Sequence, residues 1–352
     1  MKKCQIAYLA CSTAVVGAVL GAAPPVAGHT THLVRPGESI QKAVDAAGPG
    51  DTVLVTLGTY RESVTVRTPG LTLRGMGRGT VIEPGPKKAA DSCAAGGNGI
   101  CVVGTKDRAV EGVTIASLTV TGFAKAGVSA METDGLTVRK VTAAKNGVWG
   151  IAQERSVRSV FRKNTALDNG DAGLFLANTI SAEEGAADTR GTVVEDNRLE
   201  GNRIGVTVRR LRNLSVEDNH LTGNCAAVFV VGDENKPKTG DLTVRDNHIA
   251  RNNKSCPKTE RLPFLQGSGI VLTGAEDTLV TGNTITENIG TSPLSGGIVL
   301  FKSFVGVTSE RNRITDNVLE GNAPADLVNT DTGAGNTFEA NSCRASQPAG
   351  LC

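Results

Sequence analysis

Residues 216–224 read VEDNHLTGN, and the last six letters, from Asn219 to Asn224, form a phrase that recurs along the chain. The phrase consists of an asparagine, any residue, an apolar residue, two further residues and a second asparagine. Its seven copies begin at Asn164, Asn197, Asn219, Asn247, Asn283, Asn312 and Asn336. This self-similarity within 352 residues predicts one elongated solenoid instead of two ordinary domains.

Three apolar segments accompany each phrase: one inside it, one before it and one after it. The segment that follows begins with a small residue, as in GLFLA from Gly173, GVTVR from Gly205, AVFVV from Ala227, GIVLT from Gly269 and GIVLF from Gly297. Neighbouring copies lie 22 residues apart between Asn197 and Asn219, and 28 apart between Asn219 and Asn247. Such a repeat holds three short strands and three turns, which is one coil of a parallel β-helix.

The regular asparagines are explained by the stacking of these coils. Stacked strands lie about 4.8 Å apart, so equivalent turn residues come directly above one another. An inward-pointing asparagine can then hydrogen-bond the turns of its neighbours, and asparagine tolerates the left-handed conformations that turns require. The asparagines are therefore predicted to be structural and not catalytic.

The overall composition fits many tight turns joined by short strands. Glycine is abundant at 43 residues, and aromatic residues make up only 3% of the chain. The 37 basic and 35 acidic residues leave a net charge of +2, which gives no electrostatic reason to expect nucleic acid or a membrane surface as partner.

The N-terminus has the pattern of a secretory signal peptide over residues 1–28. Lys2 and Lys3 precede an apolar run over residues 6–23, and PPVAG follows with small residues around a cut. A retained membrane anchor is the alternative, which the glycines and the proline pair disfavour. We therefore expect a secreted, extracellular protein with no stable membrane insertion after cleavage.

Six cysteines remain after removal of that segment, and an even number in an exported chain predicts disulfides. The spacings favour three local pairs, which are Cys93–Cys101, Cys225–Cys256 and Cys343–Cys352. No Cys-x-x-Cys or mixed Cys/His group of zinc spacing is present.

Two stretches resemble known families. Residues 38–84, which begin ESIQKAVDAAGPGDTVLV, resemble the N-terminal segment of secreted right-handed parallel β-helix proteins of the pectin-lyase-like superfamily. Residues 150–179, GIAQERSVRSVFRKNTALDNGDAGLFLANT, are similar to repeats of the carbohydrate-binding and sugar-hydrolase β-helix family, which includes copper-maturation accessory proteins of nitrous oxide reductase. The resemblance implies an all-β, single-stranded, right-handed parallel β-helix solenoid over 51–341. It also implies an N-terminal cap over 29–50, with a helix near 39–47, and a C-terminal cap or tail over 342–352.

In that superfamily, polysaccharides typically lie along the outer face of the first sheet. Strand alternation there predicts that Val128, Ile151, Leu174 and their equivalents point inward and that the next residue of each points outward. The outward set includes an exposed aromatic strip suited to sugar stacking, formed by Phe175, Phe229 and Phe301. The alternative is that the long loops 181–190, 232–240 and 253–267 fold over this face and bury it as a secondary core.

Polar residues beside this strip are candidates for chemistry. Glu154 is predicted as a catalytic base and Arg209 as a clamp for a carboxylate. Three further residues in the flanking turns and strand ends are predicted to contact the substrate, namely Trp149, Asp171 and Lys302.

A second group lies at the corner occupied by the asparagines. The residues next to them on successive coils form a possible column of divalent-cation ligands, such as ligands for calcium, and they are Asp196, Asp218, Asp246, His220 and His248. The alternative is an ordinary solvated corner, and Arg198 would lower the cation affinity.

Three functions compete on this scaffold. The first is a polysaccharide lyase or epimerase acting on uronic-acid glycans, although the motifs of the superfamily's galacturonases, pectin methylesterases and mannuronan epimerases are missing. The second is a noncatalytic glycan-binding or envelope-associated β-helix protein. The third, copper maturation, is poorly served by 3 methionines and 4 histidines. Whether the protein is an enzyme is left open, a glycan partner is expected, and the chain is expected to be a monomer.

Overall fold

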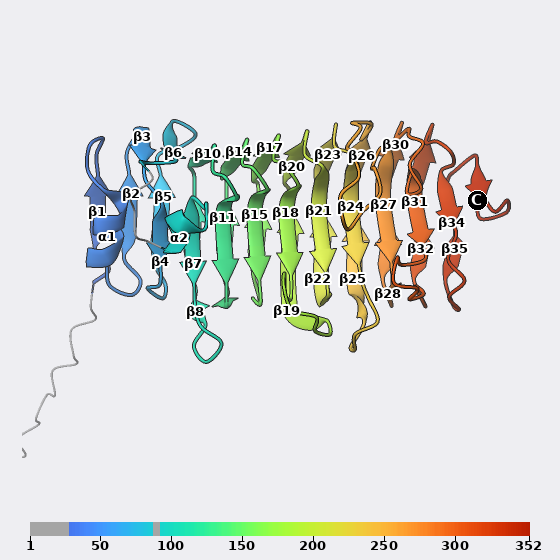
Figure 1. Ribbon diagram of the computed structural model, residues 1–352, viewed down its shortest axis with the longest axis horizontal. Helices are drawn as coiled ribbons and strands as arrows, with labels where there is room; N and C mark the ends of the chain where they lie inside the picture. Colours follow the sequence, from blue (N-terminus) through green and yellow to red (C-terminus); the bar gives the residue numbers. More distant parts are fainter. Residues whose placement is uncertain (1–27, 87–91) are drawn as a thin grey trace, which may run out of the picture.

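The computed structural model describes residues 28–86 and 92–352, so the predicted signal peptide, apart from Gly28, lies outside the described residues. The chain winds into an elongated stack of coils that follow one another along the long axis from the N-terminus to the C-terminus (Figure 1). Three sheets of 13, 10 and 11 strands run along this stack and are named here sheets A, B and C.

Sheet A contains β1 (Thr31–Val34), β2 (Thr52–Val55), β5 (Thr72–Gly75), β9 (Thr114–Ala116), β13 (Thr137–Arg139), β16 (Val160–Arg162), β19 (Ala187–Glu195), β22 (Leu211–Glu217), β25 (Thr239–Arg245), β28 (Ala275–Glu276), β29 (Leu279–Thr281), β32 (Arg313–Thr315) and β35 (Thr337–Glu339). Sheet B contains β3 (Gly58–Arg61), β6 (Thr80–Glu83), β10 (Thr119–Thr121), β14 (Thr142–Ala144), β17 (Thr165–Leu167), β20 (Arg198–Glu200), β23 (His220–Thr222), β26 (His248–Ala250), β30 (Thr284–Thr286) and β33 (Val318–Glu320).

Sheet C contains β4 (Val64–Val66), β7 (Ile100–Val103), β11 (Ala126–Met131), β15 (Trp149–Glu154), β18 (Ala172–Ala177), β21 (Ile204–Arg209), β24 (Ala226–Val231), β27 (Ser268–Thr273), β31 (Gly296–Phe301), β34 (Leu327–Asn329) and β36 (Ser346–Gln347). A small fourth sheet pairs β8 (Val110–Glu111) with β12 (Thr133–Asp134). Strands of successive coils pair in parallel, as β15, β18 and β21 do in sheet C. This confirms the predicted parallel β-helix.

Apolar side chains fill the inside of the coil. In sheet C, Ile151, Leu174 and Val206 lie in register on adjacent strands, and each is at most 2% exposed. Burial of side chains of this size stabilises the fold by about 1.5 to 3 kcal/mol each. The small residue before them is also required, because a Cβ on Gly205 would lie 2.6 Å from the carbonyl oxygen of Ala227. The predicted inward parity of this strand is therefore confirmed.

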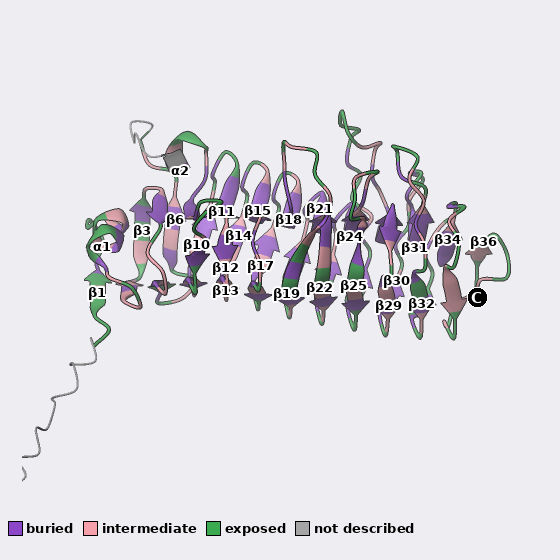
Figure 2. Cartoon of the chain, turned by 90° about the horizontal axis from the view of Figure 1, so that it is seen from below, coloured by how far each residue is buried: buried purple, intermediate pink, exposed green. Residues whose placement is uncertain are grey.

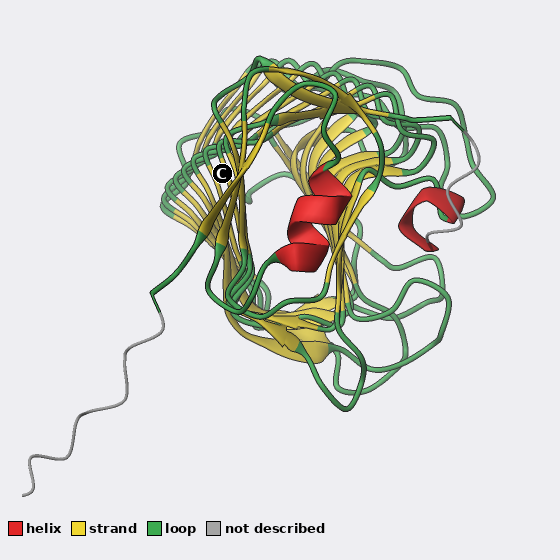
Figure 3. Ribbon diagram, turned by 90° about the vertical axis from the view of Figure 1, so that its left-hand side faces the viewer, coloured by secondary structure: helices red, strands yellow, loops and turns green. Residues whose placement is uncertain are grey.

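The N-terminal end of this interior is closed by α1 (Ile40–Ala46), whose Ile40 and Val44 are buried. Figure 3, viewed along the stack, shows α1 lying across the end of the coil. A second short helix, α2 (Ser92–Ala95), lies outside it. The parallel ladder extends beyond 51–341 at both ends, because β1 pairs with β2 and β36 pairs with β34.

Two asparagine ladders line two corners of the coil and confirm the structural role of these residues. At the corner from sheet A to sheet B, the amide oxygen of Asn219 accepts from the backbone N–H of Asn197 at 3.0 Å, and Asn247 accepts from Asn219 in the same way at 3.0 Å. This ladder contains Asn164, Asn197, Asn219, Asn247, Asn283, Asn317 and Asn341. At the corner from sheet B to sheet C, the second ladder contains Asn146, Asn169, Asn202, Asn224, Asn252, Asn288 and Asn322.

Two details of the repeat prediction are wrong. The copies that begin at Asn312 and Asn336 enclose strands of sheet A, so they lie one corner earlier than the other five, and Asn312 stacks on Asn336 there. The left-handed residue of each turn is also the one before the ladder asparagine, as at Asp196, where φ is 55°. Hydrogen bonds of the asparagine side chain hold the turn, while the residue before the asparagine takes the left-handed φ.

The three predicted disulfides are present, with Cα–Cα distances of 5.8 Å, 6.0 Å and 5.4 Å for Cys93–Cys101, Cys225–Cys256 and Cys343–Cys352. Such bonds persist in oxidising compartments. None of the helices in the described part of the chain combines the length and the apolar character needed to cross a lipid bilayer.

Candidate functional site

The outer face of sheet C carries the predicted aromatic residues in the predicted register. Phe175 pairs with Thr207 and Thr207 with Phe229, so the two rings stand two coils apart on one face. The prediction that these rings are exposed is wrong, because Phe175 is 7% exposed and Phe229 only 1%. Neither ring is free to stack on a sugar.

Loops cover these rings and form a second hydrophobic core outside the coil, as the alternative prediction stated. The outer core joins Phe175 and Phe229 to Leu265 and Leu294 from the loops, with Ile180 packed against it. In the loop 253–267, Cys256 and Leu265 exchange backbone hydrogen bonds of 2.9 and 3.0 Å, and the Cys225–Cys256 disulfide ties this loop to the sheet. The outer core therefore depends on loop insertions as well as on the strands.

Glu154 and Arg209, predicted as catalytic, hold one of these loops. They flank Ala177 on successive strands of sheet C. A Glu154 carboxylate oxygen accepts from the backbone N–H of Ile180 at 3.0 Å, and Arg209 donates to the carbonyl oxygen of the same residue at 3.2 Å. Burial and the nearby cations Arg210 and Arg261 lower the pKa of Arg209, which still stays charged. The pair acts as a clip for the 178–186 loop.

The face is more open towards its N-terminal end, over β11. Met131 at the end of β11 is 41% exposed and Ser129 is half-buried, whereas their equivalents on β18, Ala177 and Phe175, are buried. Figure 2 shows short turns beside β11 and β15 and taller loops further along the stack. The accessible part of this face therefore lies over β11, because Ala152 on the neighbouring β15 is only 4% exposed.

One turn position, directly before the strands of sheet C, carries a charged residue on three of four successive coils. Lys125, Val148, Asp171 and Arg203 each immediately precede a strand of sheet C. Backbone hydrogen bonds join them in order, from Val148 N–H to the Lys125 carbonyl at 2.9 Å and from Asp171 N–H to the Val148 carbonyl at 2.6 Å. Stacking of the coils thus brings together side chains that are far apart in the sequence.

Trp149 is the centre of this group. Its indole N–H donates to Asp171 Oδ2 at 3.2 Å, and its ring stacks on Phe175 with 4.7 Å between centroids. The ammonium of Lys125 lies 5.4 Å from the Trp149 ring centroid, within the range of a cation–π contact. The structure therefore brings the predicted residues Trp149 and Asp171 into direct contact.

Asp171 is the ionisable group whose environment is most unusual here. Burial raises the pKa of its carboxyl, while the Trp149 hydrogen bond and the charge of Arg203 act in the opposite direction. The Nε of Arg203 is 3.9 Å from Asp171 Oδ1, and 35% of the Asp171 side chain is still exposed. The result is a partly buried carboxyl that solvent or a ligand can reach.

Arg203 also fixes the neighbouring loop. Its guanidinium donates to the carbonyl oxygens of Pro257 at 2.6 Å and Pro263 at 3.3 Å. Only 7% of the side chain is exposed, and burial lowers its pKa without removing its charge. Sequence reasoning missed Lys125 and Arg203, although their place before the strand of each repeat could have marked them as neighbours of Asp171.

The remaining predicted substrate contacts lie elsewhere. Phe301 is half-buried at the end of β31 with its ring 5.2 Å from Phe304, and Lys302 beside it is exposed. The strands β21, β24 and β27 separate this end of sheet C from β18, next to Asp171. Phe301 and Lys302 are therefore not part of the Asp171 site.

The predicted cation column does not form a ligand set. In residues 28–86 and 92–352, no group of three or more His, Cys, Asp or Glu side chains is placed to hold one metal ion. Asp246 pairs with Arg245 at 3.0 Å and Asp196 with Lys163 at 3.9 Å, while the rings of His220 and His248 stack at 4.9 Å. Calcium needs six to eight oxygen ligands, so these residues do not fit it. Burial, then His248 and Arg198, lower the pKa of His220.

Comparisons with known proteins agree with this architecture. Residues 90–239 match the family described as "Right handed beta helix region", and residues 180–347 match "Periplasmic copper-binding protein (NosD)". Together with the parallel sheets of the coil, the first match shows that the chain is a right-handed parallel β-helix protein. No curated protein matches it.

Several solved structures share the fold at low sequence identity. The A-module of the Azotobacter vinelandii mannuronan C-5 epimerase AlgE4 is 20% identical, with a TM-score of 0.58 and coverage of 88% of this chain and 91% of that one. An alginate lyase from Paenibacillus sp. str. FPU-7 is 15% identical, with a TM-score of 0.58 and coverage of 87% and 99%. The Dettilon tailspike protein is 12% identical, with a TM-score of 0.53 and coverage of 88% and 68%. At these identities the likeness establishes the fold alone.

Proposed function

We propose that this protein is an exported carbohydrate-binding β-helix protein whose ligand contacts the open part of sheet C around Asp171. The observation that carries the proposal is the uneven covering of this face, because loops bury it around Phe229 and leave it accessible beside Lys125 and Asp171. Export rests on the predicted signal peptide and the three disulfides. Two of the structures with the same fold are named for mannuronan and alginate, which supports a polysaccharide as the ligand.

The side chains of this site suit an acidic sugar. Lys125 is exposed and supplies a positive charge for the carboxylate of a uronic acid. Asp171 accepts one hydrogen bond, from Trp149, so its carboxyl has remaining capacity for sugar hydroxyls. A ligand bound by these two groups would lie along the turns that precede β11, β15 and β18.

A second candidate function is a uronate lyase or epimerase, which the environment of Asp171 favours. A proton-transfer group works best when its pKa lies near the operating pH. Burial raises the pKa of the Asp171 carboxyl and so brings it closer to neutral pH. In an elimination, ionised Asp171 would take the proton next to the sugar carboxylate, the glycosidic C–O bond would break, and the departing oxygen would take a proton from water. Lys125 would stabilise the negative charge that develops.

The test is binding of the mature protein to a panel of uronic polysaccharides, together with ultraviolet absorbance of an unsaturated product. The K125Q/D171N variant is expected to lose at least about tenfold in affinity, equivalent to about 1.4 kcal/mol. A K42Q/D45N variant changes the same residue types at exposed positions on α1, away from the site, and is expected to bind like the unmodified protein.

The outcomes separate the candidates. Binding without product supports a glycan-binding protein, and product formation that D171N abolishes while binding persists supports the lyase. Equal affinities for the unmodified protein and K125Q/D171N, or no binding to any glycan in the panel, would overturn the proposed site.

A further inference from the structure

A stripe of cations lies on a different side of the molecule, where sheet A turns into sheet B in the N-terminal half. Arg74, Arg139 and Arg162 belong to one outward column of sheet A, because Arg74 pairs with Ala116, Ala116 with Arg139, and Arg139 with Arg162. Lys140 and Lys163 follow directly in the turn. We call this set the basic stripe, with the members Arg74, Arg139, Lys140, Arg162 and Lys163.

Almost none of this charge is neutralised within the described residues. The ion pair formed by the basic stripe there is Lys163 with Asp196, at 3.9 Å between side chains that are 58% and 51% exposed. Arg139 and Arg162 face each other directly on neighbouring strands. Like charges in such positions destabilise a sheet, so the chain keeps an unfavourable arrangement at this corner.

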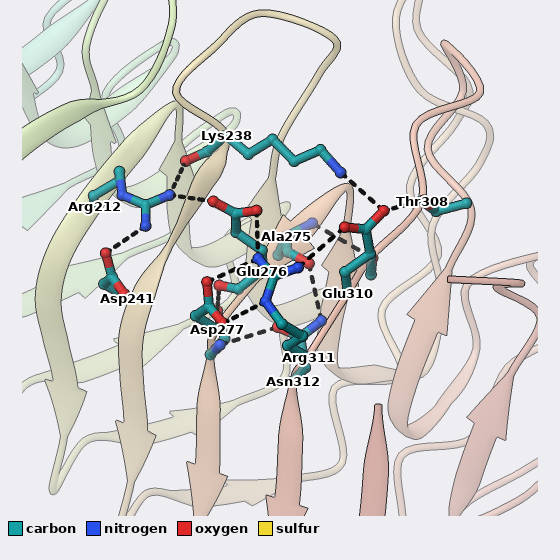
Figure 4. A network of polar contacts seen from close by, with 12 residues as sticks. Arg212, Lys238, Asp241, Ala275, Glu276, Asp277, Thr308, Glu310, Arg311 and Asn312 are labelled. Carbon is teal, nitrogen blue, oxygen red and sulfur yellow. Dashed lines mark hydrogen bonds and ion pairs between the residues drawn. The ribbon is translucent and has the colours of Figure 1, made fainter. Parts of the chain in front are cut away.

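The same column is neutralised further along the stack. Glu217 pairs in register with Arg245, and the Arg245 guanidinium contacts Glu217 at 2.5 Å and Asp246 at 3.0 Å. Sheet A also carries a compact network in which Arg311 contacts Glu276 and Asp277, both at 2.8 Å (Figure 4). Glu195 lies in register with Arg162 and ends the basic stripe, so carboxylates compensate the later part of this column. Among the described residues, Arg74, Arg139 and Arg162 form no ion pair.

The neighbouring column of sheet A is made of short polar side chains. Thr72, Thr114 and Thr137 lie in register on successive strands, and all three are half-buried. Each of these threonines precedes a residue of the arginine column by two positions, so its side chain lies on the same outer face of the sheet. A chain rich in hydroxyl groups could therefore lie against the sheet while its charges contact the basic stripe.

We propose that the basic stripe binds a chain of acidic polysaccharide that lies parallel to the helix axis. Its arginines lie at multiples of the coil repeat of about 4.8 Å, with Ala116 on the coil after Arg74, so Arg74 and Arg162 are three repeats, about 14 Å, apart. This spacing suits extended sugar units that each carry a carboxylate, whereas each strand of duplex DNA places a phosphate every 3.4 Å or so along its axis. The basic stripe is a second glycan contact, and sheets A and C are different sides of the coil (Figure 2).

The test compares two variants that each remove four positive charges. R139Q/K140Q/R162Q/K163Q changes the basic stripe, and R198Q/R251Q/R313Q/R344Q changes exposed arginines outside it. Retention on immobilised polyuronate is measured as sodium chloride increases, and circular dichroism checks the fold. The stripe variant is expected to lose about tenfold in affinity at low salt and much of its salt dependence, while the control changes less than about twofold.

The K125Q/D171N variant distinguishes this proposal from the proposed function. Loss of salt-sensitive retention in the stripe variant, but not in the four-arginine control, supports the basic stripe. This conclusion does not depend on whether K125Q/D171N also weakens binding. Unchanged retention in the stripe variant overturns the basic stripe but leaves the proposed function standing if K125Q/D171N still weakens binding. Stripe-dependent binding to duplex DNA that equals the binding to polyuronate also overturns it, because the surface would then select charge alone.

Discussion

The molecule has two hydrophobic cores, and they are built differently. The interior core takes side chains from all three sheets, coil after coil, as Phe161, Leu199 and Leu174 show. The outer core uses one face of sheet C and completes itself with loop residues such as Leu265 and Leu294. The repeat therefore determines the packing inside the coil, whereas insertions of unequal length determine which part of its outer surface is accessible.

This difference explains where the candidate site lies. Coils with short turns leave the outer face of sheet C accessible near Met131, and the coil that carries the 253–267 loop is covered. Asp171 lies at the boundary between the accessible and the covered coils. Arg203, which is close to Asp171, donates hydrogen bonds to the 253–267 loop. A site at such a boundary combines partial burial with access.

The largest expected effect comes from removing one phenylalanine from each core. Phe161 in the interior core and Phe229 in the outer core are both 1% exposed. Replacing either residue with alanine should cost about 3 to 5 kcal/mol, because each change removes a buried ring and leaves a cavity. Denaturant titration of F161A and F229A measures both costs.

Hydrogen exchange then separates the two cores. In F229A the amides of Cys256 and Leu265, which pair in the covering loop, should exchange faster relative to global unfolding than in F161A. A cost below about 1 kcal/mol for F229A would mean that the outer core contributes little to stability.

A smaller effect is expected at the asparagine ladder that supports the interior core. The Asn219 side-chain amide donates to the carbonyl oxygen of Val194 at 2.9 Å, and its oxygen accepts from Asn197. N219L leaves these buried turn groups unpaired and should cost about 1 to 3 kcal/mol. The same change at half-buried Asn336, near the end of the stack, is the matched control and should cost less. Equal denaturant midpoints for N219L and the unmodified protein would contradict the structural role of the ladder.

The smallest expected effect is a pair of pH dependences with opposite sign. Hydrogen bonds from the backbone N–H groups of Thr30 and Gly48, then His32, lower the pKa of Asp51 from 3.8 to about 2. A lowered pKa stabilises the fold above the unfolded value, so this contribution is present above about pH 4 and is lost as the pH falls towards 2. Burial raises the pKa of Asp171, so its contribution is greatest at low pH and declines as the pH rises through the folded value.

Melting temperatures across this pH range test both signs. D51N should melt below the unmodified protein at neutral pH, and the difference should shrink as the pH falls towards 2. D171N should melt at the same temperature or higher at neutral pH, and the difference should disappear in acid. Parallel pH profiles for the two variants would show that one of these two assignments is wrong.

The candidate site was only partly predictable from sequence. Trp149 and Asp171 occupy equivalent turns of the repeat, which predicts that they are neighbours, and the indole N–H of Trp149 donates to Asp171. The exposure of Phe229 was wrong because strand alternation tells which face a side chain points to, not what covers that face. Strand alternation places Glu154 and Arg209 on that face as polar residues, but their hydrogen bonds to Ile180 depend on a loop path that the repeat does not encode.

The sequence alone predicts the parallel β-helix, the interior core, the asparagine ladder and the cysteine pairs. A coil that repeats with a fixed strand spacing brings equivalent positions into contact, so the residue pattern along the chain is also the pattern along the stack. Three features follow only from the tertiary structure: which loops cover sheet C, the proximity of Arg203 to Asp171, and the corner at which the phrase from Asn312 lies. Loops have no repeating register, so their contacts follow from the packing of particular side chains in three dimensions.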